Sequence, residues 1–301
     1  MKNFKIAAIV VTYNRRELLL RCLDAIVKQE YKPSVIYVVD NASTDGTDIM
    51  LRNLVFDIPL KIIQLKENLG GAGGFNEGIK AAYEENAFDA FWVMDDDGIP
   101  DRSCLNNMAP YLNTNAHIAP LVLSVENPQK LAFPYLVQKN YNEIIQIYGE
   151  KGYISNYSNP FNGILFRKDL VATIGYPKKE MFIWGDEREY VARSRKYGYP
   201  PITIINAIHL HPADRLVLYD DFLKNKQIVY VESKLRRYCF YRNSAYINKK
   251  YKSIKSHLYY FFSYTFYYLW SRRFDIQGLF FFYQASVDGL VENFSKHKSF
   301  L

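Results

Sequence analysis

A repeating order of apolar strands and amphipathic helices near the start of the chain constrains the fold more than any other feature. The run IAAIVVTY at residues 6–13 is β-branched and nearly free of polar side chains, and residues 15–29 carry apolar side chains at helical spacing. A strand without a polar face must be buried on both sides. Later strands are predicted at residues 35–40, 60–65 and 90–97, and later helices to about residue 53 and over 75–85. This alternation predicts an α/β fold with a Rossmann-like, mostly parallel, doubly wound sheet.

Polar side chains follow the predicted strands at the points where the strands end. They are Thr12, Asn14, Asp40, Asn68 and the cluster Asp95–Asp97. In a doubly wound sheet, ligands bind beyond the carboxyl ends of the strands. These positions are therefore predicted to line one binding site at one edge of the sheet.

Three adjacent carboxylates, Asp95, Asp96 and Asp97, end the fourth predicted strand. Such neighbours repel one another and raise each other's pKa unless a cation neutralises them. Strand alternation over residues 90–97 sends Asp95 and Asp97 to the same side and Asp96 elsewhere. Asp95 and Asp97 then suit a hard ion such as Mg²⁺ or Mn²⁺. A solvated acidic loop or a helix cap is the alternative interpretation.

The glycine-rich stretch KENLGGAGGFNEG at residues 66–78 lies between a predicted strand and a predicted helix. Its glycines would let backbone N–H groups approach a phosphate at the positive end of that helix. The stretch is not a dinucleotide-binding fingerprint, because Asn76 stands where the last glycine of GxGxxG belongs and the motif follows the third strand. A flexible loop without a ligand is the alternative.

A further acidic segment, GDEREYVARSRKYGY at residues 185–199, is typical of a loop that enters a helix. Asp186 and Glu187 lie near the predicted helix N-terminus, where the macrodipole stabilises negative charge, so ordinary capping explains one or two acids. Trp184, two residues before Asp186, and a second polar strand end, AIHLHP at residues 207–212, indicate a functional site as well.

Two histidines, His209 and His211, are two residues apart on another predicted strand and therefore share a face. A hydrogen-bonded core histidine is the usual explanation for such a residue. Near a carboxylate-bound metal, one of them becomes a candidate nitrogen ligand.

The C-terminal part differs in charge and in aromatic content. The chain carries a net charge of +7, yet residues 222–301 hold 14 Lys and Arg against 4 Asp and Glu, and 19 of the 49 aromatic residues lie between Tyr238 and Tyr283. We therefore place a domain boundary at residue 222, between a catalytic domain over 1–222 and a mainly helical, aromatic and basic region over 223–301. Tyr and Trp favour the headgroup zone and basic clusters favour anionic lipid, which predicts peripheral membrane or lipid-acceptor association. A helical core or a contact in a homo-oligomer is the alternative, and RNA binding is disfavoured because no nucleic-acid module is recognisable.

Compartment and anchoring follow from the cysteines and from hydropathy. The three cysteines, Cys22, Cys104 and Cys239, are far apart and odd in number, and no secretory signal opens the chain. Both features predict a reducing, cytoplasmic environment. No stretch of about 18 residues is continuously apolar, so a bilayer-spanning segment is not expected.

Together these motifs resemble the inverting family 2 glycosyltransferases of the GT-A fold. The resemblance rests on VTYNRRELLLRCLDAI, VVDNASTDGT, NLGGAGGFNEG, the DDD strand end, FNGILFRKDLV at 161–171 and GDEREYVARSRKYGY, in that order, over residues 5 to about 215. The NLGGAGGF and WGDE segments look most like bacterial galactofuranosyltransferases. Rhamnosyltransferases that use dTDP-rhamnose have a similar outline.

The resemblance implies a role for each matched residue. Asp95, Asp97 and His211 would hold Mn²⁺ or Mg²⁺, and Asp96 would face the nucleotide ribose. Glu187 takes the position of the catalytic base, where the family usually has Asp, and Asp186 is the second candidate. Trp184 would contact the acceptor. The donor-binding positions implied are Thr12, Asn14, Arg15, Asp40, Asn68, Gly70 and Gly71.

The implied reaction is a single displacement. A UDP-sugar, UDP-galactofuranose by resemblance, would transfer its sugar with inversion to a lipid-linked or growing surface glycan, at the inner face of the plasma membrane. Metal stabilises the departing diphosphate, and one base removes the acceptor proton. A sugar nucleotidyltransferase is a more remote alternative, because TYNRR occupies the place of its glycine-rich signature, and a non-catalytic nucleotide-sugar-binding protein is another.

Overall fold

The computed structural model describes residues 3–133, 140–213, 217–220 and 227–301. The chain forms two compact units. The first combines Met1–Lys179 with Arg193–Ala213, and the second combines Glu180–Ala192 with Asp214–Leu301. The boundary predicted at residue 222 lies outside the described residues. The acidic segment around Glu187 belongs to the same unit as the C-terminal helices.

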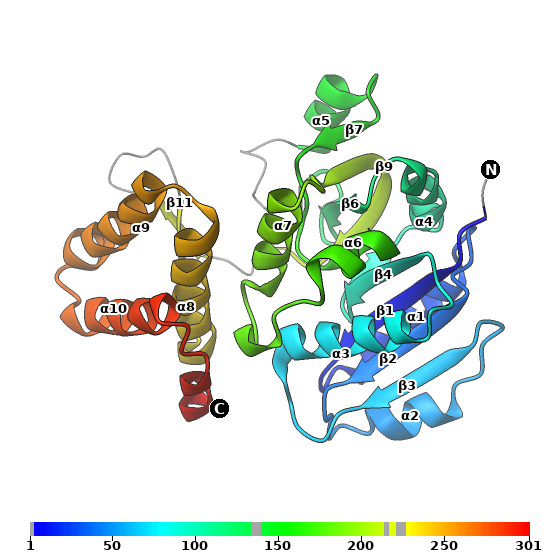
Figure 1. Cartoon of the computed structure of the whole chain (residues 1–301), viewed down its shortest axis with the longest axis horizontal. Helices are drawn as coiled ribbons and strands as arrows, with labels where there is room; N and C mark the ends of the chain where they lie inside the picture. The colour runs from blue at the N-terminus through cyan, green and yellow to red at the C-terminus, as the bar shows by residue number, and fades with distance from the viewer. Residues whose placement is uncertain (1–2, 134–139, 214–216, 221–226) are drawn as a thin grey trace. The chain divides into compact units, whose positions relative to one another are not determined.

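The first unit contains a sheet with the strand order β3-β2-β1-β4-β8-β6-β9-β5, and β7 pairs with β9 at its side (Figure 1). The strands are β1 (Ile6–Thr12), β2 (Val35–Asp40), β3 (Leu60–Gln64), β4 (Ala90–Asp95), β5 (Ile99–Pro100), β6 (His117–Ser124), β7 (Tyr153–Ser155), β8 (Asn162–Arg167) and β9 (Ile202–His211). The first four predicted strands run parallel, so the α/β fold class is confirmed. Beyond β4 the sheet is mixed, because β8, β5 and β7 pair antiparallel with their neighbours.

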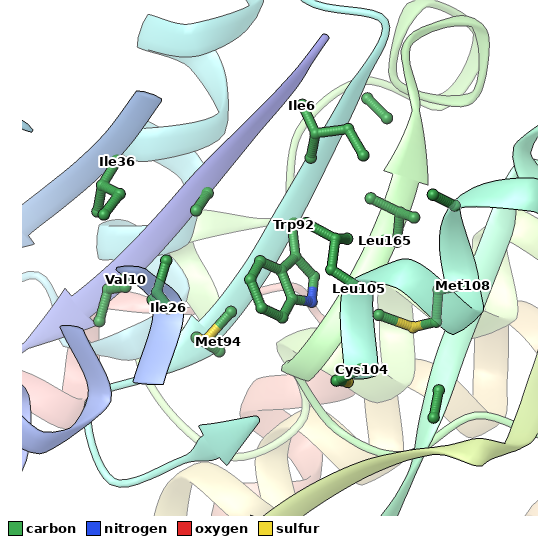
Figure 2. Packing of buried hydrophobic residues seen from close by; sticks show 14 of the residues in the cluster. Ile6, Val10, Ile26, Ile36, Trp92, Met94, Cys104, Leu105, Met108 and Leu165 are labelled. Carbon is green, nitrogen blue, oxygen red and sulfur yellow. The ribbon is translucent and has the colours of Figure 1, made fainter. Parts of the chain in front are cut away.

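Helices cover this sheet and close its core. They are α1 (Arg16–Val27), α2 (Thr47–Asn53), α3 (Gly70–Glu84), α4 (Cys104–Met108), the 3₁₀ helix η1 (Ala109–Asn113), α5 (Tyr141–Tyr148) and α6 (Lys168–Ile174). Figure 2 shows Trp92 of β4 among side chains from β1, α4 and β8. Its indole N–H donates to the Gly163 carbonyl at 2.9 Å, so the one polar atom of this large side chain is satisfied in the core.

Helix α3 begins at Gly70, five residues before its predicted start, so most of the glycine-rich stretch is helix rather than loop. The glycines allow close packing. A Cβ on Gly74 would lie 2.4 Å from Val11 Cγ1, and one on Gly78 would lie 2.6 Å from Ile9 Cγ2. The spacing of four residues places both glycines on the helix face that contacts β1. These glycines therefore serve helix–sheet packing, a role that the phosphate interpretation missed.

The second unit is mainly helical. Its elements are η2 (Lys179–Met181), whose first residue belongs to the first unit, the antiparallel strands β10 (Val217–Asp220) and β11 (Gln227–Tyr230), α8 (Lys234–Tyr251), α9 (Ile254–Phe266), the π-helical turn η3 (Tyr267–Ser271), α10 (Ile276–Leu290) and η4 (Ser295–Phe300). Helix α7 (Asp186–Lys196) also begins in this unit. Aromatic side chains build its core, and Tyr241 and Tyr268 join their hydroxyls at 2.7 Å within it. Helix α10 lies directly against α8, since a Cβ on Gly289 would meet the Arg242 carbonyl oxygen at 2.0 Å.

Among the described residues, every helix is too short or too polar to cross a membrane. Cys22, Cys104 and Cys239 are all buried thiols.

The glycine packing yields a stability prediction. Gly78→Ala should lower the free energy of unfolding by about 1 to 3 kcal/mol, because overpacking against Ile9 and Val39 exceeds the gain in helix propensity. Gly71→Ala is the matched control in the same helix, since a Cβ there meets nothing within 4 Å. Urea unfolding of both variants measures the difference. Equal stability of the two would contradict the packing role of Gly78.

Candidate active site

A buried charge cluster lies where β1 and β4 end side by side. The parallel register pairs Val11 with Asp95, so the residues after the two strands meet. Thr12 Oγ1 donates to Asp96 Oδ2 at 2.7 Å. Arg15 Nη1 donates both to Asp96 Oδ1 at 3.0 Å and to Asp97 Oδ2 at 2.7 Å. One guanidinium therefore bridges the two buried carboxylates.

Burial and pairing act in opposite directions on these charges. Burial raises the pKa of Asp96 above its ordinary value, although Arg15 and Thr12 oppose the rise. Burial alone would lower the pKa of Arg15, but Asp96 and Asp97 more than offset this effect, so the pKa of Arg15 lies above its usual value. Arg15 therefore supplies positive charge to carboxylates for which the sequence predicted neutralisation by a bound cation.

The expected alternation of the three acids is wrong. Strand β4 ends at Asp95, and residues 96 and 97 form a turn, so the two-residue period of a strand does not reach them. Asp96 and Asp97 consequently turn toward the same guanidinium. The prediction had placed Asp97 with Asp95 and Asp96 apart from both.

The two histidines of β9 have different surroundings. His211 Nε2 lies 3.2 Å from Asp97 Oδ1. His209 is buried between two glycines, and a Cβ on Gly98 would lie 2.2 Å from its Nε2. Burial lowers the pKa of His209 to about 3. The structure thus brings His211 to the acidic cluster, while the ring of His209 fills the space behind Gly98.

The acidic cluster matches a hard divalent cation in the kind of its donors. Carboxylates and an imidazole are suitable ligands, and Asp97 and His211 face each other. Within the part of the chain that the structure describes, however, no group of three or more His, Cys, Asp or Glu side chains is arranged to hold a metal ion. One oxygen of Asp97 faces His211, and Arg15 donates to the other oxygen.

A second polar group surrounds the end of β2. Asp40 is fully buried, and its Oδ1 accepts from the Ser43 backbone N–H at 2.9 Å. Its Oδ2 has no hydrogen-bond partner among the described residues. A buried carboxylate oxygen without a donor is costly unless a ligand supplies one. Asn14, in the left-handed region at φ 51°, accepts from the Thr44 backbone N–H at 2.7 Å, so it orders the loop after β2.

The start of α3 is held by side chains rather than left open. Asn68 Oδ1 accepts from the Gly70 backbone N–H at 2.8 Å. Asn41, which the sequence analysis did not select, accepts from the Leu69 N–H and donates to the Gly70 carbonyl. Its position directly after Asp40 was the available signal. The predicted donor-binding positions in this segment are Asn68, Gly70 and Gly71. Gly71 has open space beside it, because a Cβ there would meet no atom within 4 Å.

The remaining predicted residues, Trp184, Asp186 and Glu187, belong to the second unit. Asp186 is buried with 4% exposure, whereas Glu187 is only partly buried. Glu187 Oε2 accepts from the Gly185 backbone N–H at 3.2 Å, which is the capping contact that the alternative interpretation expected. The ring of Trp184 packs edge-on against Phe240 of α8.

The bridging role of Arg15 yields a pH-dependent prediction. Arg15→Gln should lower the free energy of unfolding by about 1 to 3 kcal/mol at pH 7, because two buried carboxylates lose their partner while the site keeps some contact with solvent. The folded-state pKa of Asp96 then rises further above its unfolded value. Stability falls as pH rises between those two values, so the loss should be smaller at pH 5 than at pH 7.

Arg16→Gln is the matched control, since Arg16 pairs with the exposed Glu17. Urea unfolding at both pH values should show a change within about 0.5 kcal/mol for this variant. A loss in Arg15→Gln that does not depend on pH would rule out the proposed charge compensation.

The chain is similar to known proteins in sequence and in fold. The model of the family described as glycosyl transferase family 2 matches residues 7–174. The galactofuranosyltransferase GlfT1 of Mycolicibacterium smegmatis is 34% identical over 253 residues, which cover 80% of this chain and 82% of that protein. GlfT1 of Mycobacterium tuberculosis is 32% identical over 249 residues, covering 80% of this chain and 81% of its own length.

Among solved structures, the mannosyltransferase PcManGT from Pyrobaculum calidifontis, in complex with GDP-Man and Mn²⁺, is similar with a TM-score of 0.58 and 17% identity. The match covers 99% of this chain and 79% of that one, and it shows likeness of fold. The family match over more than half of the chain and the GlfT1 identity over four fifths of it lead to one conclusion: the chain belongs to glycosyl transferase family 2 and is a GT-A glycosyltransferase.

Proposed function

We propose that this glycosyltransferase transfers galactofuranose from UDP-galactofuranose to a lipid-linked or growing bacterial surface glycan. The observation that carries the proposal is the similarity to two galactofuranosyltransferases over about four fifths of both chains. The charged cluster at the ends of β1 and β4, with His211 beside it, gives that similarity a chemical basis.

The donor nucleotide would bind at the ends of β1 and β2. Asp40 Oδ2 is buried and can accept the N–H of a uracil ring, which would satisfy it. Thr12, Asn14 and Arg15 would frame the nucleotide, and Asp96 would face the ribose. At the start of α3, the positive helix end and the open space beside Gly71 suit the approach of a phosphate. Asn68 and Gly70 shape that start.

Asp95, Asp97 and His211 would hold Mn²⁺ or Mg²⁺. When bound, the ion stabilises negative charge on the departing diphosphate. Arg15 already compensates part of the carboxylate charge through its ion pairs with Asp96 and Asp97. Arg15, together with such an ion, would balance the negative charge of the acidic cluster.

Glu187 would act as the base. It would take the proton of an acceptor hydroxyl while that oxygen attacks the anomeric carbon, and the bond to the diphosphate breaks in the same step, which inverts the configuration. Its carboxylate is the more accessible of the two adjacent acids, because Asp186 is buried. Trp184, two residues before Asp186, would offer an aromatic face to the acceptor sugar.

The base assignment has a direct test. Glu187→Gln should keep UDP-sugar binding and lose transfer by about 10² to 10⁴-fold, the usual effect of removing a general base. Asp186→Asn should be milder. Free nucleotide release from a panel of UDP and dTDP sugars, with and without Mn²⁺, measures both variants and the donor. If the protein prefers dTDP-rhamnose, the proposed donor is wrong. If Asp186→Asn loses more transfer activity than Glu187→Gln, Asp186 is the base.

The C-terminal unit would dock on an anionic membrane. Large apolar side chains are exposed at helical spacing on α9 and α10 and on the turn between them: Ile254, Leu258, Phe262, Trp270, Phe274, Ile276, Phe280, Val287 and Val291. The two helices lie side by side, since Tyr283 of α10 bonds Thr265 and stacks on Phe261 of α9. Arg272 and Arg273 lie between the exposed Trp270 and Phe274 in the sequence. Exposed apolar side chains with basic residues among them are complementary to an interface that contains anionic lipid.

This docking surface predicts vesicle binding that one variant should weaken. The double variant Trp270→Ser and Phe274→Ser should bind vesicles of phosphatidylcholine and phosphatidylglycerol about tenfold more weakly or worse, because each ring contributes about 1.5 to 3 kcal/mol when buried. Val55→Ser, 91% exposed in the first unit, is the control. Sedimentation with vesicles at low and high salt measures binding. The face would instead be an oligomer contact if the protein does not bind vesicles and forms a dimer that the double variant disrupts.

A further inference from the structure

The segment that leads into the proposed base has an unfavourable backbone conformation. Phe182 and Trp184 have φ values of 65° and 62°, and Gly185 has a φ of 138°. A non-glycine residue in the left-handed region costs about 1 to 2 kcal/mol. Such a conformation persists only where surrounding contacts over-determine it. Residues 181–185 must therefore be held from outside the segment.

Asn243 of α8 makes the contacts that hold the segment. Its side-chain Nδ2 lies 3.1 Å from the Met181 carbonyl oxygen, 3.0 Å from that of Ile183 and 3.0 Å from that of Trp184. Asn243 is fully buried. The side-chain amide thus lies beside three carbonyl oxygens of the turn, of which that of Met181 also accepts from the Ile183 backbone N–H at 2.8 Å.

Arg242 sets the orientation of that amide. Its Nε donates to Asn243 Oδ1 at 3.0 Å, which requires the NH₂ group to face the three carbonyls. Its Nη2 donates to the Met181 carbonyl at 2.7 Å, and its Nη1 donates to the Phe294 carbonyl at 3.1 Å. The guanidinium is fully buried, and it donates to two backbone carbonyls of this unit as well as to the Asn243 side chain.

Helix α8 approaches the turn too closely for any side chain at residue 185. A Cβ on Gly185 would lie 2.8 Å from Asn243 Cβ. After the turn, Arg188 Nη2 donates to Ser244 Oγ at 3.0 Å, and the Tyr251 hydroxyl donates to Glu189. Contacts from α8 therefore fall on both sides of Glu187.

We propose that Asn243, oriented by Arg242, is a positioning residue for Glu187. Because Asn243 contacts three carbonyls of the turn, it determines where α7 begins and therefore where the Glu187 carboxylate lies. The C-terminal helices would then take part in catalysis through the placement of the base, in addition to any role at a membrane. This inference rests on the proposed function, in which Glu187 is the base.

Asn243→Asp is the sharpest variant, because it keeps the shape and replaces two donors with a carboxylate facing three carbonyl oxygens. We expect kcat to fall about tenfold to a hundredfold, the size of effect that a small misplacement of a catalytic group produces. The donor KM should stay within about twofold, because the predicted donor-binding residues lie in the other unit. Amide hydrogen exchange of residues 183–189 should become faster, while the rest of the unit stays protected.

Two further variants keep the test decisive. Asn243→Ser retains one hydroxyl donor and should recover part of kcat, and it replaces the first variant if Asn243→Asp does not fold. Tyr246→Phe is the matched control on α8, where the hydroxyl bonds Lys250, and it should leave kcat and exchange unchanged.

Unchanged kcat in Asn243→Asp, with Glu187→Gln inactive, would overturn the positioning role and leave the base in place. Full transfer by Glu187→Gln would instead overturn the proposed base. A fall in kcat accompanied by faster exchange throughout the C-terminal unit would show a general structural role and likewise overturn the proposal.

Discussion

Compensation of buried carboxylate charge at the ends of β1 and β4 is the constraint around which the first unit is organised. The parallel register of these two strands brings the residues after them together, and two of the acids there are almost fully buried. Buried charges persist only when they are paired and hydrogen-bonded. Arg15 and Thr12 supply that pairing, so the turn after β4 and the turn after β1 depend on each other.

The same principle of satisfying buried polar groups governs the second unit with different chemistry. There the groups are backbone carbonyls of the turn at residues 181–185, and the donors come from Asn243 and Arg242, about 60 residues later in the chain. Neighbouring aromatic rings provide the low-polarity surroundings in which such hydrogen bonds are strong. The aromatic and basic C-terminal region therefore also supports the acidic segment.

The aromatic residues of the C-terminal region serve two purposes that composition cannot separate. Tyr238, Tyr241, Tyr264 and Tyr268 are buried, and hydroxyl partners such as Asp288 satisfy their polar ends. Trp270 and Phe274 are about 70% exposed on the turn between α9 and α10. Helix packing against α8 decides which rings are covered, so the aromatic residues divide between the core and the exposed surface.

The sequence by itself determined the parallel strands β1 to β4, the convergence of polar residues at their ends and the glycosyltransferase family, because apolar periodicity and local motifs are encoded in neighbouring residues. Only the tertiary structure decided that α3 begins at Gly70 and uses its glycines for packing, that Asp96 and Asp97 share Arg15, and that Asn243 holds the turn before Glu187. Each of these contacts joins residues from different elements. The free energy that selects them comes from close packing and from pairing of buried polar groups, and both depend on neighbours in space that no local pattern specifies.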